Sequence, residues 1–140
     1  MINGVHLLLS SSNPGANRAF FRDVLGFAHL DAGEGWLIFV LPPTEMGIHP
    51  AEKKLTQTHV SQALATSTIY LMCDNLRETL ESLAAKGVEH TEIQDAGWGE
   101  ASSIALPGGA NLGLYEPRHR LATTLSALRS EQHAPSPSKI

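Results

Sequence analysis

The stretch Val5-His6-Leu7-Leu8-Leu9 is repeated in similar form at Ile69-Tyr70-Leu71-Met72-Cys73, and this repetition decides the fold. Each apolar run is followed by a segment with helical spacing of apolar residues. That segment ends at a glycine in both halves, Gly26 in the first and Gly87 in the second, which is the residue that commonly closes a helix. The two glycines lie 61 positions apart.

A strand-rich stretch follows the helix in each half and contains a glycine near its end, Gly47 in the first half and Gly113 in the second. These glycines lie 66 positions apart. The two spacings differ by only a few residues, as expected for a duplicated unit with one loop insertion. We therefore predict an α+β fold of two βαβββ modules, with curved mixed β-sheets, outer helices and a concave surface suited to a small ligand.

The repeat also sets the predicted domain boundaries. Residues 1–117 form a single domain, with module one at about 1–50, a polar linker at about 51–66 and module two at about 67–117. Residues 118–140 are predicted to form a C-terminal helix, over about 121–128, followed by a disordered tail rich in proline and small polar residues.

Helix and strand signals place the elements within each module. One helix is predicted from about Ala16 to Gly26, and another begins after a cap at Asp74 or Asn75 and ends at Gly87. Alternation, apolar runs and turn residues predict four strands in each half. The predicted strands cover residues 5–9, 27–30, 36–41 and 46–49 in the first half, and 68–73, 89–93, 101–106 and 111–115 in the second.

Composition excludes several classes of protein. The 140 residues, 42% of them hydrophobic and 17% charged, suffice for one globular domain. A net charge of −4 without an extended basic cluster argues against binding to nucleic acid or to an anionic membrane surface. No apolar run reaches the length of a membrane span, no basic flank of a signal peptide is present, and Cys73 is the only cysteine. A cytoplasmic protein is predicted.

Two segments carry a resemblance to a known family. The chain contains Ala19-Phe20-Phe21-Arg22-Asp23-Val24-Leu25-Gly26-Phe27, and later Leu106-Pro107-Gly108-Gly109 followed by Gly113-Leu114-Tyr115-Glu116-Pro117. In these segments it resembles the vicinal oxygen chelate superfamily, which includes glyoxalase I, bleomycin resistance proteins, fosfomycin resistance proteins and extradiol dioxygenases. The resemblance covers about residues 4–117 and implies the same two-module fold.

Catalytic members of that superfamily hold a divalent metal with side chains from the outer strands of each module. The first corresponding position here is His6, and the second is Gly47 or His49, depending on register. The third is Thr68, where glyoxalase-like members usually have histidine, and the fourth is Gly113, where they have glutamate. Because a divalent ion needs three or four good donors, the chain is expected to be a divergent member without the usual metal site and without a cofactor.

Strand alternation predicts which side chains share the concave surface. Side chains at every second position point to the same face, so His6, Tyr70, Gly113 and Tyr115 are expected on the inner face and Glu116 on the opposite one. Gly113 is expected to leave free space beside Tyr115, at the position where relatives carry a metal-binding carboxylate.

Six residues are predicted to contact a ligand, with His6, Tyr70 and Tyr115 inside the concave surface and the others at its rim. The alternative for His6 is a hydrogen-bonded structural histidine, and the alternative for the tyrosines is a place in the core. Trp98 lies in a Gly-Trp-Gly sequence that suits a mobile lid. The predicted ligand-binding residues are His6, Trp36, His49, Tyr70, Trp98 and Tyr115.

Three hypotheses of function remain open at this stage. The first is a glyoxalase/bleomycin-resistance-like protein that binds a small organic molecule in an aromatic-lined concavity without a catalytic metal. The second is a metal-dependent lyase or isomerase of the glyoxalase type that uses His6 and His49. The third is a structural or partner-binding domain. The resemblance implies a homodimer, whereas the ligand, any catalytic residues and any reaction, whether of the lyase, isomerase or dioxygenase type, are not indicated.

Overall fold

The first half of the chain supplies a short helix and a hairpin. The computed structural model describes residues 1–51 and 54–125. Helix α1 (Pro14–Ala19) begins after Asn13, whose side-chain oxygen accepts a hydrogen bond from the backbone N–H of Ala16, at 3.2 Å. The helix continues as a π-helical turn, η1 (Phe20–Val24), and is followed by the antiparallel hairpin of β1 (His29–Asp31) and β2 (Leu37–Phe39).

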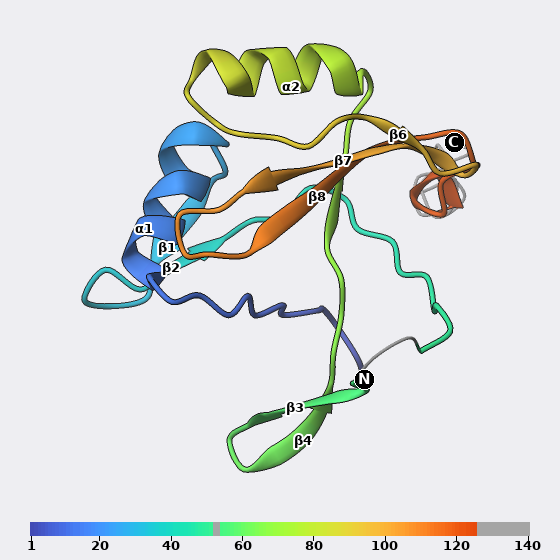
Figure 1. The fold of residues 1–140 in the computed structure, drawn as a ribbon. Helices are drawn as coiled ribbons and strands as arrows, with labels where there is room; N and C mark the ends of the chain where they lie inside the picture. Colours follow the sequence, from blue (N-terminus) through green and yellow to red (C-terminus); the bar gives the residue numbers. More distant parts are fainter. Residues whose placement is uncertain (52–53, 126–140) are drawn as a thin grey trace, which may run out of the picture.

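A second hairpin lies in the segment predicted as the linker between the modules. It consists of β3 (Thr56–His59) and β4 (Gln62–Ala65), which pair antiparallel, and every residue of both strands is exposed. Figure 1 shows that this hairpin projects away from the sheet and helix of the second half.

The second half forms a four-stranded sheet. Its elements are β5 (Tyr70–Met72), α2 (Leu76–Ala85), β6 (Gln94–Asp95), β7 (Gly99–Ala105) and β8 (Asn111–Pro117). The strand order is β5-β8-β7-β6, with β5 parallel to β8 and the other neighbours antiparallel. This order places the first and last strands of the module side by side, as a βαβββ unit requires.

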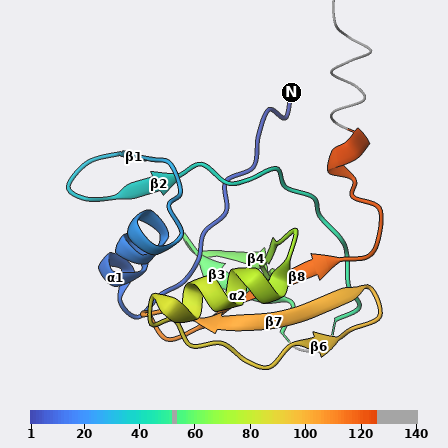
Figure 2. The same ribbon diagram turned by 90° about the horizontal axis from the view of Figure 1, so that it is seen from above.

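Helix α2 covers one face of this sheet (Figures 1 and 2) and forms the core with it. Leu76 and Leu80 of the helix are almost completely buried, and so are Ile104 of β7 and Leu114 of β8. Phe20 and Phe21 of η1 complete the same core from the first half. Burial of each such side chain contributes roughly 1.5–3 kcal/mol to folding.

The loop before α1 is fastened to the turn between β7 and β8. The buried side-chain oxygen of Asn17 accepts a hydrogen bond from the N–H of Gly108, at 2.7 Å. The hydroxyl of Ser12 donates to the carbonyl oxygen of Gly108, also at 2.7 Å. A Cβ atom at Gly108 would overlap the hydroxyl oxygen of Ser11 and crowd the carboxamide of Asn17, so a larger residue would displace these side chains.

The predicted fold class is confirmed, and so are both helices and the glycines that end them. The α+β architecture has small sheets with helices outside, Asn75 caps α2, and Gly26 and Gly87 adopt positive φ angles of 72° and 82°. Among the described residues, no helix has both the length and the apolar character of a bilayer span.

Three strand predictions in the described residues are wrong or displaced. Residues 5–9 and 46–49 lie outside the strands, and residues 89–93 contribute an isolated bridge between His90 and Ile104 ahead of β6. An apolar run indicates that a segment will be buried, but a β-ladder also requires a partner strand, which the run does not specify. The predicted helix at about 121–128 lies partly, and the predicted tail wholly, outside the described residues.

Candidate ligand-binding site

Three aromatic side chains meet on the sheet face opposite to α2. Tyr70 comes from β5, Tyr115 from β8, and Trp98 from the turn that precedes β7. The ring centroids are 5.6 Å apart for Tyr70 and Tyr115, 5.7 Å for Tyr70 and Trp98, and 5.0 Å for Trp98 and Tyr115. We call these three residues the aromatic cluster.

The cluster follows from strand pairing. Leu112 and Leu114 of β8 are buried on the α2 side, so Gly113 and Tyr115 lie on the other face. The parallel register pairs Tyr70 with Gly113, which brings Tyr70 next to Tyr115 in the neighbouring strand. Tyr70 and Tyr115 therefore share a face, as the alternation of side chains predicts.

The space above Gly113 is filled, which corrects the sequence-based expectation of free space there. A Cβ atom at Gly113 would lie 2.4 Å from Cδ1 of Tyr70, a distance that no real side chain maintains. The Tyr70 ring thus occupies the space beside Gly113 that was expected to be free. Glycine at this position lets an aromatic ring lie directly on the backbone of β8.

A polar chain extends from the cluster to an acidic side chain. The hydroxyl of Tyr115 lies 3.1 Å from Nε2 of His119, whose ring stacks on that of Tyr115. Nε2 of His119 in turn lies 3.9 Å from Oε1 of Glu45, and Oε2 of Glu45 accepts a hydrogen bond from the N–H of Ala122, at 2.6 Å. Burial raises the pKa of Tyr115, and the negative charge of Glu45 raises that pKa further.

The other predicted ligand residues lie apart from the aromatic cluster. His6 and His49 are exposed, and Nδ1 of His49 lies 2.8 Å from the carbonyl oxygen of Pro50. Trp36 lies in the turn between β1 and β2, where the guanidinium of Arg18 sits 4.3 Å from the centre of its ring. In the described part of the chain, the ring contacts of the cluster are with one another and with His119.

The donor set of this site does not fit a catalytic metal ion. Within residues 1–51 and 54–125, no three His, Cys, Asp or Glu side chains gather closely enough to hold one. Glu116 is on the α2 side, as predicted, where its Oε1 accepts a hydrogen bond from the N–H of Leu76 at 3.0 Å. Burial raises the pKa of the Cys73 thiol, which disfavours the thiolate that a metal would bind.

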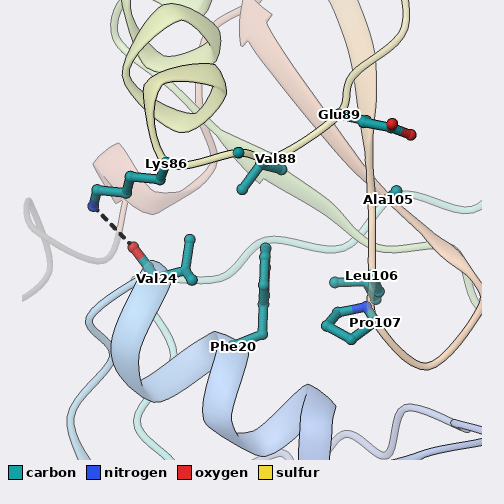
Figure 3. Close-up of a pocket in the computed structure, with 9 residues that line it drawn as sticks. Phe20, Val24, Lys86, Val88, Glu89, Ala105, Leu106 and Pro107 are labelled. Atoms are coloured by element: carbon teal, nitrogen blue, oxygen red, sulfur yellow. Dashed lines mark hydrogen bonds between the residues drawn. The ribbon is translucent and has the colours of Figure 1, made fainter.

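A separate pocket of about 340 Å³ lies on the helix side of the sheet (Figure 3). Its apolar wall includes Phe20 of η1 and Val88 and Leu106 of the second half. Nζ of Lys86 donates a hydrogen bond to the carbonyl oxygen of Val24 across one end, at 3.2 Å. This pocket therefore follows the seam between the two halves and does not contact the aromatic cluster.

Two residues beside the cluster were missed by the sequence analysis, Glu45 and His119. The sequence predicts a solvent-exposed histidine at His119, and its side chain is indeed 40% exposed, but its contact with Tyr115 was not predicted; Glu45 carries no motif. Their meeting depends on contacts between residues more than 70 positions apart. One local signal existed for His119, since it follows the last strand by two residues and lies four residues after Tyr115.

Comparison with known proteins identifies the family. The sequence profile described as "Glyoxalase/Bleomycin resistance protein/Dioxygenase superfamily" matches residues 5–117. The match covers most of the chain, and the chain belongs to this superfamily. Comparison with curated protein sequences gives no match.

Solved structures with the same fold have low sequence identity to this chain. The antibiotic-binding protein TnmS3 from Streptomyces sp. CB03234 is 18% identical, with 80% of this chain and 99% of that one covered and a TM-score of 0.51. Lactoylglutathione lyase from Agrobacterium tumefaciens is 17% identical, with coverages of 77% and 88% and a TM-score of 0.52. A member of the superfamily from Sphaerobacter thermophilus DSM 20745 is 19% identical, with coverages of 82% and 98% and a TM-score of 0.51. At these identities the likeness establishes the fold alone.

Proposed function

We propose that this protein binds a small planar organic molecule on the aromatic cluster, without a catalytic metal. The observation that carries the proposal is the cluster itself, three large aromatic side chains in mutual contact on the sheet face that α2 leaves uncovered. Tyr70 is 43% exposed and Trp98 is 44% exposed. Large aromatic side chains left exposed together on one surface are typical of ligand-binding and interaction sites.

The glyoxalase-type alternative is less well supported by the donor set. His6 and His49 would have to be joined by further ligands, and the position of the usual carboxylate is Gly113, covered by the Tyr70 ring. The fold family includes both an antibiotic-binding protein and a lyase, so the family alone does not choose. The choice of a binding function rests on the residues of this chain.

The proposal includes a homodimer, because the chain exposes far more surface than a compact monomer of its mass. The accessible area is 11085 Å², whereas a folded monomer of 15.0 kDa exposes about 7,000 Å². If the 17 residues outside the described ranges are allowed the area of a fully extended chain, about 2,600 Å² as an upper bound, an excess of about 1,500 Å² remains. A standard interface buries about 800 Å² per partner.

Many of the exposed large hydrophobic side chains lie in the first half. Leu7, Leu8 and Leu9 are 38%, 50% and 45% exposed, and Met46 and Ile48 are 84% and 91% exposed. These residues belong to the two segments that were predicted as strands. A second copy that pairs with them would bury their side chains and provide the missing partner strand. A cytoplasmic location, predicted from the sequence, belongs to the same proposal.

Ligand binding is tested by a thermal-shift screen of small planar aromatic compounds, because a ligand of the folded state raises the melting temperature. Hits are checked in a Trp36→Phe background, where Trp98 is the only tryptophan, by fluorescence titration. We expect Tyr70→Ala to weaken binding of a hit about tenfold or more, since aromatic contacts of this size are each worth roughly 1–2 kcal/mol. His29→Ala, which removes an exposed ring elsewhere, is the matched control.

If Tyr70→Ala and His29→Ala bind the hit as tightly as the parent protein, the ligand site is not the aromatic cluster. A metal-dependent activity that disappears in His6→Ala and is unaffected by Tyr70→Ala would instead support the lyase or isomerase alternative. The dimer is tested by light scattering during size-exclusion chromatography. We expect a mass of two chains for the parent protein and of one chain for Leu8→Asp, while a monomeric parent protein would contradict the dimer.

A further inference from the structure

The segment that follows β8 contacts the aromatic cluster and is attached at both of its ends. It begins at Arg118, whose backbone N–H donates a hydrogen bond to the carbonyl oxygen of Trp98, at 3.0 Å. It ends at Ala122, whose N–H donates to Oε2 of Glu45. We call residues 118–122 the strap, and most of its residues are exposed to solvent on their outer side.

The strap places a histidine ring against one ring of the cluster. The rings of His119 and Tyr115 are stacked, with an interplanar angle of 27° and centroids 6.0 Å apart. The other two rings of the cluster meet Tyr115 edge to face, at 85° and 81°. His119 therefore lies where a planar ligand that stacks on Tyr115 has to lie. Tyr115 is accordingly far less exposed than Tyr70 or Trp98.

A hydrogen bond also holds the histidine ring on the tyrosine. Nδ1 of His119 lies 3.0 Å from the carbonyl oxygen of Arg120, which can only accept, so Nδ1 carries the proton of the neutral ring and donates. Nε2 is then the acceptor for the hydroxyl of Tyr115. The chain thus binds a planar ring on its own aromatic cluster, through one stacking contact and one hydrogen bond.

These contacts are weak enough to be exchanged for those of a ligand. A stacked ring pair and one hydrogen bond that replaces a bond to water favour the closed strap over the open one by roughly tenfold. A ligand that needs the face of Tyr115 finds only the open fraction of the molecules ready to bind. Its apparent affinity is lower in proportion to that fraction.

We infer that the strap is an internal competitor for the ligand site, in which His119 covers Tyr115 in the free protein and a planar ligand binds there by displacing it. This inference rests on the proposed function and specifies how the same site is regulated. Because Glu45 belongs to the first half of the chain, opening of the strap also breaks a contact with that half. Molecules too small to extend from the exposed rings of the cluster onto Tyr115 leave the strap closed.

The test uses quinoline, a neutral planar probe, and follows its binding by the NMR signal of the Trp98 indole N–H. That signal is unambiguous in the Trp36→Phe background, where Trp98 is the only tryptophan. We expect His119→Ala to bind quinoline roughly fivefold to tenfold more tightly than the parent protein, because Tyr115 is no longer covered. Glu45→Ala removes the attachment of the far end and leaves every ring in place, so it should raise the affinity about twofold.

The matched control is His29→Ala. The ring of His29 also lies against an aromatic ring, that of Phe39, with centroids 5.7 Å apart, but away from the cluster. Its removal should leave the affinity for quinoline unchanged. Circular dichroism and the melting temperature establish that all variants are folded.

Hydrogen exchange of a single amide distinguishes displacement of the strap from a merely structural role of His119. The N–H of Ala122 is bonded to Glu45 in the closed strap and should exchange slowly with solvent. Saturation of the parent protein with quinoline should speed this exchange, and so should His119→Ala without any ligand. A structural role alone predicts no response of Ala122 to quinoline.

The outcomes separate the inference from the proposed function. If His119→Ala binds quinoline as tightly as the parent protein or more weakly, the strap is not a competitor, while the aromatic site stands. Exchange of Ala122 that is unchanged or slower at saturation likewise overturns the inference. If quinoline leaves the Trp98 signal unchanged in every variant, the same comparisons are made with a planar hit of the thermal-shift screen, and a screen without any hit contradicts the proposed function itself.

Discussion

At the scale of single residues, Tyr115 packs against the sheet with its ring and contacts a polar residue of the site with its hydroxyl. Its ring is 9% exposed, while its hydroxyl contacts His119. Burial and, to a lesser extent, Glu45 raise the pKa of this phenol above its usual value near 10. The neutral form is therefore favoured in the folded state, and its contribution to stability is complete below the unfolded pKa and lost as the pH rises through the folded pKa.

Phenolate absorbance should consequently show one tyrosine that ionises at a higher pH than an ordinary tyrosine. We expect the alkaline titration of the parent protein to contain a component above the ordinary tyrosine range, and Tyr115→Phe to lack it. Unfolding the protein in denaturant should return the late component to the ordinary range. A titration of Tyr115→Phe identical in shape to that of the parent protein, apart from its amplitude, would contradict this assignment.

Asn17 is a second residue whose role can be isolated, since its side chain accepts one buried hydrogen bond that joins the two halves. Its buried carboxamide oxygen satisfies the N–H of Gly108, 91 positions away in the sequence. Asn17→Ala leaves that N–H without a partner, which should lower the free energy of unfolding by about 1–3 kcal/mol. Chemical denaturation measures the change. Gln57→Ala, an exposed position in β3, is the control, and an equally small effect for both would mean that water replaces the lost bond.

At the scale of elements, α2 is fixed at its first turn by two acceptors from different parts of the chain. The side-chain oxygen of Asn75 accepts from the N–H of Glu78 at 3.1 Å, and Glu116 of β8 accepts from the N–H of Leu76. A carboxylate at a helix N-terminus also interacts favourably with the helix dipole. The strand that carries Tyr115 into the site thus also positions α2 on the other face.

Removing this carboxylate should destabilise the helix without touching the aromatic cluster. We expect Glu116→Ala to lower the free energy of unfolding by about 0.5–2 kcal/mol, with ligand binding unchanged. Glu92→Ala, an exposed carboxylate away from any helix N-terminus, should cost much less. Thermal unfolding with ligand titration measures both properties. A loss of binding in Glu116→Ala at unchanged stability would show that the two faces are coupled more directly.

Local elements could be predicted from the sequence because their signals lie within the elements. The caps, apolar spacing and closing glycines determine α1 and α2, and the turn Pro107-Gly108-Gly109 determines the hairpin of β7 and β8. The segments at 5–9 and 46–49 were wrongly predicted as strands because pairing requires a partner that their own residues do not encode. The β3–β4 hairpin was missed because its strands are only four residues long and exposed on both faces, and β3 is polar.

For the candidate site, the sequence predicts only which side chains share a face of the sheet, because side chains alternate along a strand. Tyr70 and Tyr115 share a face because each occupies the appropriate position in its strand. The arrangement of Glu45, His119 and Ala122 depends on how the first half and the residues after β8 cross, which no local pattern contains. The filled space at Gly113 depends on the rotamer of Tyr70, and that choice is made by packing.

At the scale of the whole molecule, the two halves differ in packing: the apolar residues of the second half are largely buried, whereas the first half leaves apolar segments exposed. The second half has a four-stranded sheet, a covering helix and a buried core, while the first half contributes η1 to that core and leaves two apolar segments exposed. The halves nevertheless hold each other through Asn17 with Gly108, Lys86 with Val24, and Glu45 with Ala122. These contacts are independent of the peptide that connects the halves.

Cleavage of the backbone in the exposed β3–β4 hairpin should therefore leave the rest of the fold intact. Its turn residues Val60 and Ser61 have positive φ angles of 50° and 58° and no packing against the core. We expect limited proteolysis to nick this turn first, and the two fragments to elute together and to keep the ligand affinity of the intact chain. Separation of the fragments on nicking would contradict this. If they stay together, separately expressed halves can reconstitute the protein, and their reassembly becomes a reporter of ligand in a cell.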